Sequence, residues 1–264
     1  MALLATKLLL APAFVVGASL SARRFGPRVG GLVAGLPVVA GPILLVYALA
    51  HGRVFAAGAA AGTLLGLVSL IAFVVVYARL AGRAWWGVSL LAGWLAFIVG
   101  TAIFSAVSIP AGGALALAAA ALVVGLAMLP RPGPEAGTAA PPPAWDLPLR
   151  ATCALALVLT LTAVAGWLGP QLSGLLAPFP IIATVLATFT HVQRGTGEML
   201  RLLRGLISGF GAFALFCFVL SLSLRQMDTA WAFALATLVA LVTQAAAYAL
   251  GGAGRQVAAP SRAS

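Results

Sequence analysis

Acidic side chains are the scarcest chemistry in this sequence. Its 264 residues include only 4 Asp and Glu against 15 Lys and Arg, and charged residues make up 7% of the chain. Soluble domains carry about 25% charged residues, so this composition argues against a soluble protein. Every carboxylate falls in a predicted loop or at the end of a predicted span. Coupling through a mid-membrane carboxylate is therefore disfavoured, and so is a bare cation as solute.

Cysteine and histidine are equally sparse. Cys153 and Cys217 both lie in apolar runs, where cysteine acts as a small hydrophobic residue, so we expect neither a disulfide framework nor a metal site. His51 and His191 fall at the ends of predicted spans. We interpret them as interfacial polar residues, with proton coupling as the alternative. Because the sequence has no nucleophile–base pair and no phosphate-binding loop, we expect no enzyme and no cofactor.

Hydrophobic residues dominate instead, at 63% of the chain, with a mean hydropathy of +1.14. Continuous apolar runs predict membrane-spanning helices, and the lack of period-two alternation disfavours a β-barrel. The predicted fold is an all-α polytopic membrane protein with nine transmembrane helices. The predicted spans are 3–20, 29–49, 55–78, 84–108, 112–129, 149–168, 172–190, 200–222 and 229–250.

The basic residues predict the orientation of these spans. With the N-terminus outside, twelve basic residues fall on the cytoplasmic side and three outside, which agrees with the positive-inside rule. Their spread over short loops favours membrane orientation over nucleic-acid binding. Lys7 alone carries charge within the first apolar run, and Arg23 and Arg24 follow that run. We therefore interpret residues 3–20 as a retained helix and not a cleaved signal peptide.

A proline-broken apolar stretch occurs twice. Residues 26–42 superpose on residues 169–185 without a gap, at an offset of 143 residues and with seven identical positions. The same offset pairs the first three spans with spans six to eight and leaves one span between the halves, so the second half enters the membrane from the opposite side. This predicts a 4+1+4 inverted repeat, which is typical of secondary transporters. The predicted divisions are a first four-helix repeat (1–108), a linking helix with a Pro-rich cytoplasmic loop (109–148) and a second, inverted repeat with a short tail (149–264).

Prolines in the second and seventh spans mark the candidate site. Pro37 has no amide hydrogen, so the carbonyl of Val33 loses its helical donor. Pro37 also lies about 12 Å into a hydrocarbon core roughly 30 Å thick. Matched breaks near mid-membrane favour a solute site, with structural kinks as the alternative. The predicted substrate-binding residues are Gly31, Gly35, Pro37, Gly41, Pro42, Gly174, Pro178, Pro180, Thr184 and Thr188.

Glycines recur at every fourth position in the third span. Gly58, Gly62 and Gly66 form one face, and Gly205 and Gly209 repeat it in the eighth span. Small residues allow close helix packing in lipid. We therefore expect both faces to press against neighbouring helices.

The first third of the chain resembles a known family. The resembling residues are 8–10, Ala22-Arg23-Arg24, 30–37 and the aliphatic run that ends at Tyr47. They resemble the GlpM-type family of small bacterial inner-membrane proteins, and residues 150–250 look like a second, diverged copy. The resemblance implies a tandem duplication of one unit with an added helix, in the bacterial inner (plasma) membrane.

The function that these patterns favour is a secondary transporter or permease, an exporter among them, for a small polar or anionic solute. The two halves would alternate access around the broken second and seventh helices. The expected partners are the lipid bilayer and a small-molecule solute, without nucleic acid, and a homo-oligomer is left open. The expected location is the bacterial inner membrane, multi-pass, with the N-terminus outside and the C-terminus cytoplasmic. The alternative is a non-transporting membrane scaffold or envelope-assembly protein, in which glycines and prolines only pack helices. A channel is a third option.

Overall fold

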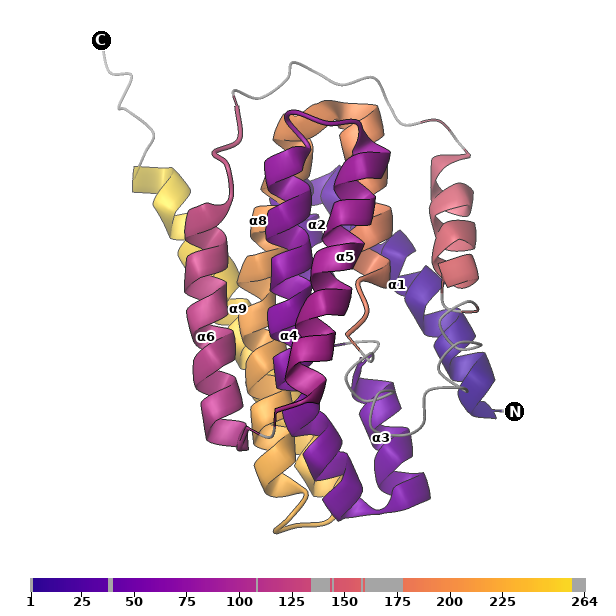
Figure 1. The fold of residues 1–264 in the computed structure, drawn as a ribbon, viewed down its shortest axis with the longest axis vertical. Coiled ribbons are helices and arrows are strands. Elements are labelled where there is room, and N and C mark those ends of the chain that lie inside the picture. Colours follow the sequence, from indigo (N-terminus) through magenta and orange to yellow (C-terminus); the bar gives the residue numbers. More distant parts are fainter. Residues whose placement is uncertain are drawn as a thin grey trace.

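The computed structural model describes residues 2–37, 40–107, 109–133, 143, 145–157, 159 and 178–257. Every regular element in these ranges is a helix, which confirms the all-α prediction. The helices are α1 (Ala2–Phe25), α2 (Pro27–Ala34), α3 (Ala40–His51), α4 (Arg53–Leu80), α5 (Trp86–Ser105), α6 (Ala111–Met128), α8 (Ile181–Ser223) and α9 (Thr229–Val257), and residues 146–157 are also helical (Figure 1).

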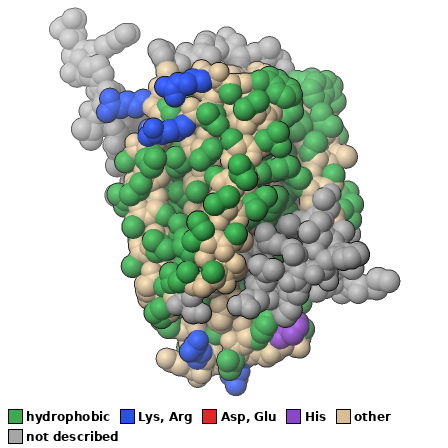
Figure 2. Space-filling view, viewed as in Figure 1, with side chains coloured by type: hydrophobic (Ala, Val, Ile, Leu, Met, Phe, Trp, Pro, Cys, Tyr) green, Lys and Arg blue, Asp and Glu red, His purple; other side chains and the backbone are tan. Residues whose placement is uncertain are grey.

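Five of the described helices are long and apolar enough to cross a membrane, namely α4, α5, α6, α8 and residues 229–249 of α9. Large apolar side chains such as Leu91 and Ile98 on α5 and Leu238 on α9 are exposed. Figure 2 shows apolar side chains over the middle of one face and Lys or Arg side chains at its two ends. This distribution matches a hydrocarbon core between two polar interfaces and indicates a membrane-embedded protein.

Two helices form the centre of the bundle. The most apolar 18-residue windows of α4 and α8 are each 67% buried, whereas those of α6 and α9 are each 17% buried. Helix α6 packs against both central helices, α5 packs on α4, and α9 packs on α8. The outer helices therefore present most of their surface to the surroundings, as lipid-facing helices do.

The break expected at Pro37 is present. Helix α2 ends at Ala34 and α3 begins at Ala40, so the predicted second span 29–49 is two helices with non-helical backbone at residues 35–37. In the other half, α8 begins at Ile181, directly after Pro180. Proline favours helix starts because the missing amide hydrogen costs nothing in the first turn. Residues 172–177, the part of the predicted span 172–190 that precedes this break, lie outside the described residues.

Helix α8 joins two predicted spans. Its 43 residues contain one non-helical position, Gly195, with φ 81° and ψ 175°, and Figure 1 shows α8 reversing direction at its upper end. Gly52, which separates α3 from α4, has nearly the same backbone, with φ 88° and ψ 165°. Positive φ at these angles is open mainly to glycine. Gly52 and Gly195 are 143 residues apart, which is the offset of the sequence repeat.

The glycines of α8 pack as expected, against α2. A Cβ atom added to Gly205 would lie 2.8 Å from the carbonyl carbon of Arg28, and one added to Gly209 would lie 3.0 Å from the Cα of Gly35. The backbones of α8 and α2 therefore lie in direct contact here, which small residues permit. The matching expectation for α4 is wrong at Gly58 and Gly62. A Cβ atom at either position meets nothing within 4 Å.

Candidate functional site

The two proline breaks meet around one small cavity. Pro37 with Leu36 from the first break, and Pro178 with Pro180 from the second, line a space of about 50 Å³. Leu206, Phe210 and Phe213 of α8 close it from the side. Two segments that are distant in the sequence thus share one site inside the bundle. Its walls are almost wholly apolar, with room for only a small number of water molecules.

Backbone groups near the breaks are partly satisfied locally. The carbonyl of Val33, expected to lack a partner, accepts a hydrogen bond from the amide of Leu36 at 3.2 Å. The carbonyl of Pro37 accepts one from Gly41 at 2.7 Å. The chain tightens at the end of α2, as helix ends commonly do when the i→i+4 donor is missing. The Val33 carbonyl therefore lacks the donor at Pro37, as predicted, but is hydrogen-bonded to Leu36 instead.

A side chain from α9 also reaches this region. The amide nitrogen Nε2 of Gln244 donates to the carbonyl oxygen of Leu32, and the Oε1 atom of Gln244 is buried without a hydrogen-bond partner among the described residues. A polar side chain that caps a helix carbonyl inside lipid stabilises the broken helix, since no water is present to do so.

Not all of the predicted site residues reach the cavity. Pro37, Pro178 and Pro180 line it together. Gly31 and Gly35 instead lie in the α2–α8 contact, where an added Cβ would approach the backbone of residues 202–209. Gly41 faces the ring of Phe216, Pro42 lies in the first turn of α3, and Gly174 lies outside the described residues. Thr188 is half-buried, and its hydroxyl interacts with the hydroxyl of Tyr77 on α4.

An aromatic group fixes the second break. The ring of Phe179 packs edge-on against Phe97, with 5.4 Å between ring centroids, and also contacts Trp94 at 6.0 Å. The indole Nε1 of Trp94 donates to the hydroxyl of Thr184 at 3.0 Å. The predicted residue Thr184 is therefore held by α5. Trp94 therefore links α5 to the start of α8.

An ion-pair cluster, formed by the buried Asp146 and Arg150 with Arg23 and Gln193 at its edge, lies near the cavity. Asp146 is 1% exposed, and its carboxylate accepts hydrogen bonds from Arg23 Nη2 at 2.6 Å and from Arg150 Nε at 2.9 Å. Gln193 Nε2 donates to the same carboxylate at 2.6 Å. Burial alone raises the pKa of Asp146, but hydrogen bonds from Arg150, Gln193 and Arg23 hold that pKa below its ordinary value of 3.8. The ionised carboxylate thus joins α1, the 146–157 helix and α8.

The ion-pair cluster has more positive than negative charge. Arg194 lines the same small pocket as Arg23 and Arg150, so three arginines face one Asp. The hydroxyl of Ser19 also lines this pocket and is buried without a hydrogen-bond partner among the described residues. Such a pocket suits an anion better than a cation.

One helical turn separates this pocket from the cavity. After the reversal in α8, Leu206 lines the cavity and Leu202 lines the pocket. Before the reversal, Ala183 lines the cavity and Leu186 lines the pocket. Residues four apart on a helix stand about 6 Å apart along its axis. The arginine-rich pocket and the cavity therefore lie next to one another in the bundle.

From the sequence, Asp146 is predicted to lie in the Pro-rich loop before the sixth span, and no role is assigned to it. The spacing of Asp146 and Arg150, four residues apart at a helix start, is the signal that could have identified the pair. His191, assigned to an interface, instead shares a hydrogen bond of 3.2 Å with the buried Tyr77 hydroxyl. Among the described residues, no group of three His, Cys, Asp or Glu is arranged to hold a metal ion. No protein-family model, curated protein or solved structure matches this chain.

Proposed function

We propose that the chain is a membrane secondary transporter for a small anionic or polar solute, with its solute path at the cavity between the two breaks. The observation that carries the proposal is the meeting of Pro37 with Pro178 and Pro180 around one space. Interrupted helices that meet inside a helical membrane bundle are where such proteins bind solutes. A bundle that serves only to pack helices has no need for two breaks at one point.

The proposed architecture is the nine-span inverted repeat. Two observations support it. Gly52 and Gly195 share a positive φ at the repeat offset of 143 residues. In each half, this glycine separates the helical segment that follows the proline break from a longer central helical segment. Under this architecture the segments of the GlpM-like unit occur twice, once in each orientation.

The arginine-rich pocket supports an anionic solute. An anion that leaves the cavity by one helical turn meets Arg23, Arg150 and Arg194. In the state described here, the carboxylate of Asp146 holds two of these guanidinium groups. In our proposal the arrival of a solute anion replaces Asp146 as their partner, which loosens α1 from the 146–157 helix and opens this side of the path.

A flux assay on reconstituted protein tests the proposal. Proteoliposomes are assayed for uptake of radiolabelled phosphate, lactate and glutamate as probes of the anionic class. The expected result is saturable uptake of at least one probe, reduced at least tenfold when Arg150→Gln removes a charge that is 6% exposed. Uptake equal to that of empty liposomes for all three probes would contradict an anion transporter.

Cysteine labelling tests alternating access independently of the solute. In a background with Cys153 and Cys217 replaced by alanine, single cysteines are placed at Leu36 and at Ile182, which line the cavity. A membrane-impermeant maleimide should reach them from one side at a time, and a probe that is transported should shift the accessible side. Val99→Cys, on the exposed face of α5, serves as the control position.

The second candidate is a non-transporting scaffold, and one observation favours it. The cavity is only about 50 Å³, and its described lining side chains are apolar. A scaffold predicts that Leu36→Cys and Ile182→Cys stay unlabelled from both sides under all conditions, and that no probe is taken up.

A further inference from the structure

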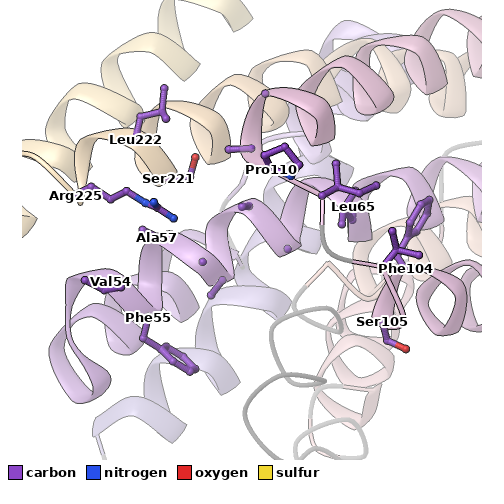
Figure 3. A pocket seen from close by; sticks show the side chains of 18 residues that line it. Val54, Phe55, Ala57, Leu65, Phe104, Ser105, Pro110, Ser221, Leu222 and Arg225 are labelled. Carbon is purple, nitrogen blue, oxygen red and sulfur yellow. The ribbon is translucent and has the colours of Figure 1, made fainter.

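A second hollow, a groove, shares no lining residue with the cavity between the proline breaks. It has a volume of about 990 Å³, at the upper end of small-molecule sites. The first half of α4, the ends of α5 and α8, and the start of α6 line it (Figure 3). Its walls are mainly apolar, with Gly58, Gly62 and Leu65 along α4 and Phe104 beside them.

The groove is as deep as one leaflet of a bilayer. Its lining residues on α4 run from Val54 to Leu65, and at 1.5 Å per residue this stretch spans about 17 Å. The hydrocarbon core is about 30 Å thick, so one leaflet contributes about 15 Å. An acyl chain fits this depth, whereas a path across the membrane would need both leaflets.

Two small residues that line the groove on α4 stand where the other half of the chain carries arginines. At the repeat offset of 143 residues, Gly58 and Ala61 correspond to Arg201 and Arg204. There, Arg201 donates to the carbonyl of Gly133 at 2.7 Å, and Arg204 donates to that of Leu129 at 2.8 Å. These two side chains cover the end of α6, whereas Gly58 and Ala61 leave the start of α6 uncovered.

One charged side chain stands at the mouth of the groove. Arg225, just after the end of α8, extends toward Ala57 in Figure 3. Its side chain makes no ion pair or hydrogen bond with any residue that the structure describes, and no described lining residue is acidic. The nearby start of α6 has no side-chain cap and no acidic residue in its first turn, so its amide groups add to the positive potential. An anionic group matches this end.

We propose that the groove binds one anionic phospholipid. The phosphate pairs with Arg225 and the first turn of α6, and one acyl chain lies along Gly58 and Gly62. The proposal does not depend on transport, since the groove shares no lining residue with the cavity between the breaks.

Native mass spectrometry of the purified full-length protein, with equal amounts of phosphatidylglycerol and phosphatidylcholine, tests this assignment. The wild type should retain one phosphatidylglycerol, about fivefold in preference to phosphatidylcholine, because one basic residue at a membrane surface contributes about that factor. Gly62→Leu fills the groove and should lower lipid retention at least tenfold. A Cβ there meets nothing within 4 Å, so the variant has room to fold. Arg225→Gln should keep a bound lipid but lose the preference for phosphatidylglycerol.

Gly211→Leu is the matched control, because a Cβ at Gly211 also meets nothing within 4 Å and Gly211 does not line the groove. It should bind lipid as the wild type does. Equal lipid retention by wild type and Gly62→Leu would overturn the proposal. A wild-type dimer that Gly62→Leu dissociates would also overturn it, and would assign the groove to a second copy of the chain.

Discussion

The contact between α2 and α8 gives the sharpest test of the fold. In Gly205→Ala, the new Cβ atom would lie 2.8 Å from the carbonyl carbon of Arg28, which is about 0.7 Å short of the ~3.5 Å at which non-bonded carbons touch. Its neighbours are backbone atoms of α2, so the helices must separate. Overpacking of this kind costs about 1–3 kcal/mol, and the gain in helix propensity returns up to ~1 kcal/mol. We expect a net loss of about 1–2 kcal/mol in the free energy of unfolding.

Thermal unfolding of the purified protein in detergent measures this loss. For a chain of this size, 1 kcal/mol corresponds to roughly 2–4 °C, so Gly205→Ala should lower the apparent Tm by roughly 2–8 °C. Gly62→Ala, the equivalent position at the repeat offset, is the matched control, because its Cβ meets nothing within 4 Å. Its Tm should stay constant or rise by a few degrees through helix propensity. The reasoning fails if both variants unfold at the same temperature.

Three further predictions concern side-chain partners. Asp146→Asn leaves two guanidinium groups without their carboxylate, so it should lower the free energy of unfolding by about 3 kcal/mol and the Tm by roughly 6–12 °C. Asp228→Asn is the control, because it removes only an exposed pair with Arg53 and should leave the Tm unchanged. The pKa of Asp146 in the folded state lies below its ordinary value of 3.8, so the stability that the carboxylate contributes is complete above pH 3.8 and is lost as the pH falls through the folded-state pKa. The difference in Tm between wild type and Asp146→Asn should therefore shrink below pH 3.8. A constant difference would contradict an ionised carboxylate. Trp94→Phe and Thr184→Val each remove the same hydrogen bond, so each should lower the free energy of unfolding by about 1 kcal/mol. In a double-mutant cycle, the double variant should be only slightly less stable than either single variant. Full additivity would show that the two groups do not interact.

Local chemistry made several features predictable from the sequence. Pro37 ends a helix because it lacks the amide hydrogen, and the break appears at that residue. Gly205 and Gly209 predicted close packing because only glycine lets two helix backbones touch, and they do pack against α2. Continuous apolar runs located α4, α5 and α6 to within three residues of their ends, because lipid requires both length and hydropathy.

Features that depend on partners distant in the sequence were not predictable. Asp146 reads as a loop residue, since its role comes from Arg23, which is 123 residues away. Gly62 and Gly205 belong to the same motif, yet one is open and the other is packed. That difference depends on where α2 lies in the bundle, and hydropathy carries no such information. The hydrogen bond between Trp94 and Thr184 was not predictable for the same reason, because the two residues are 90 positions apart in the sequence.

The order in which α2 and its packing partners are synthesised affects how incomplete chains behave in the membrane. Helix α2 is made early, but the Gln244 side chain that donates to its Leu32 carbonyl follows 212 residues later. Until the last third of the chain has been inserted, the glycine face of α2 lies in the bilayer without α8 and Gln244 packed against it. During that time this face is exposed to other helices and to quality-control proteases. Shortened forms that stop before α8 should for this reason accumulate poorly in cells, even though each of their helices is apolar enough to insert.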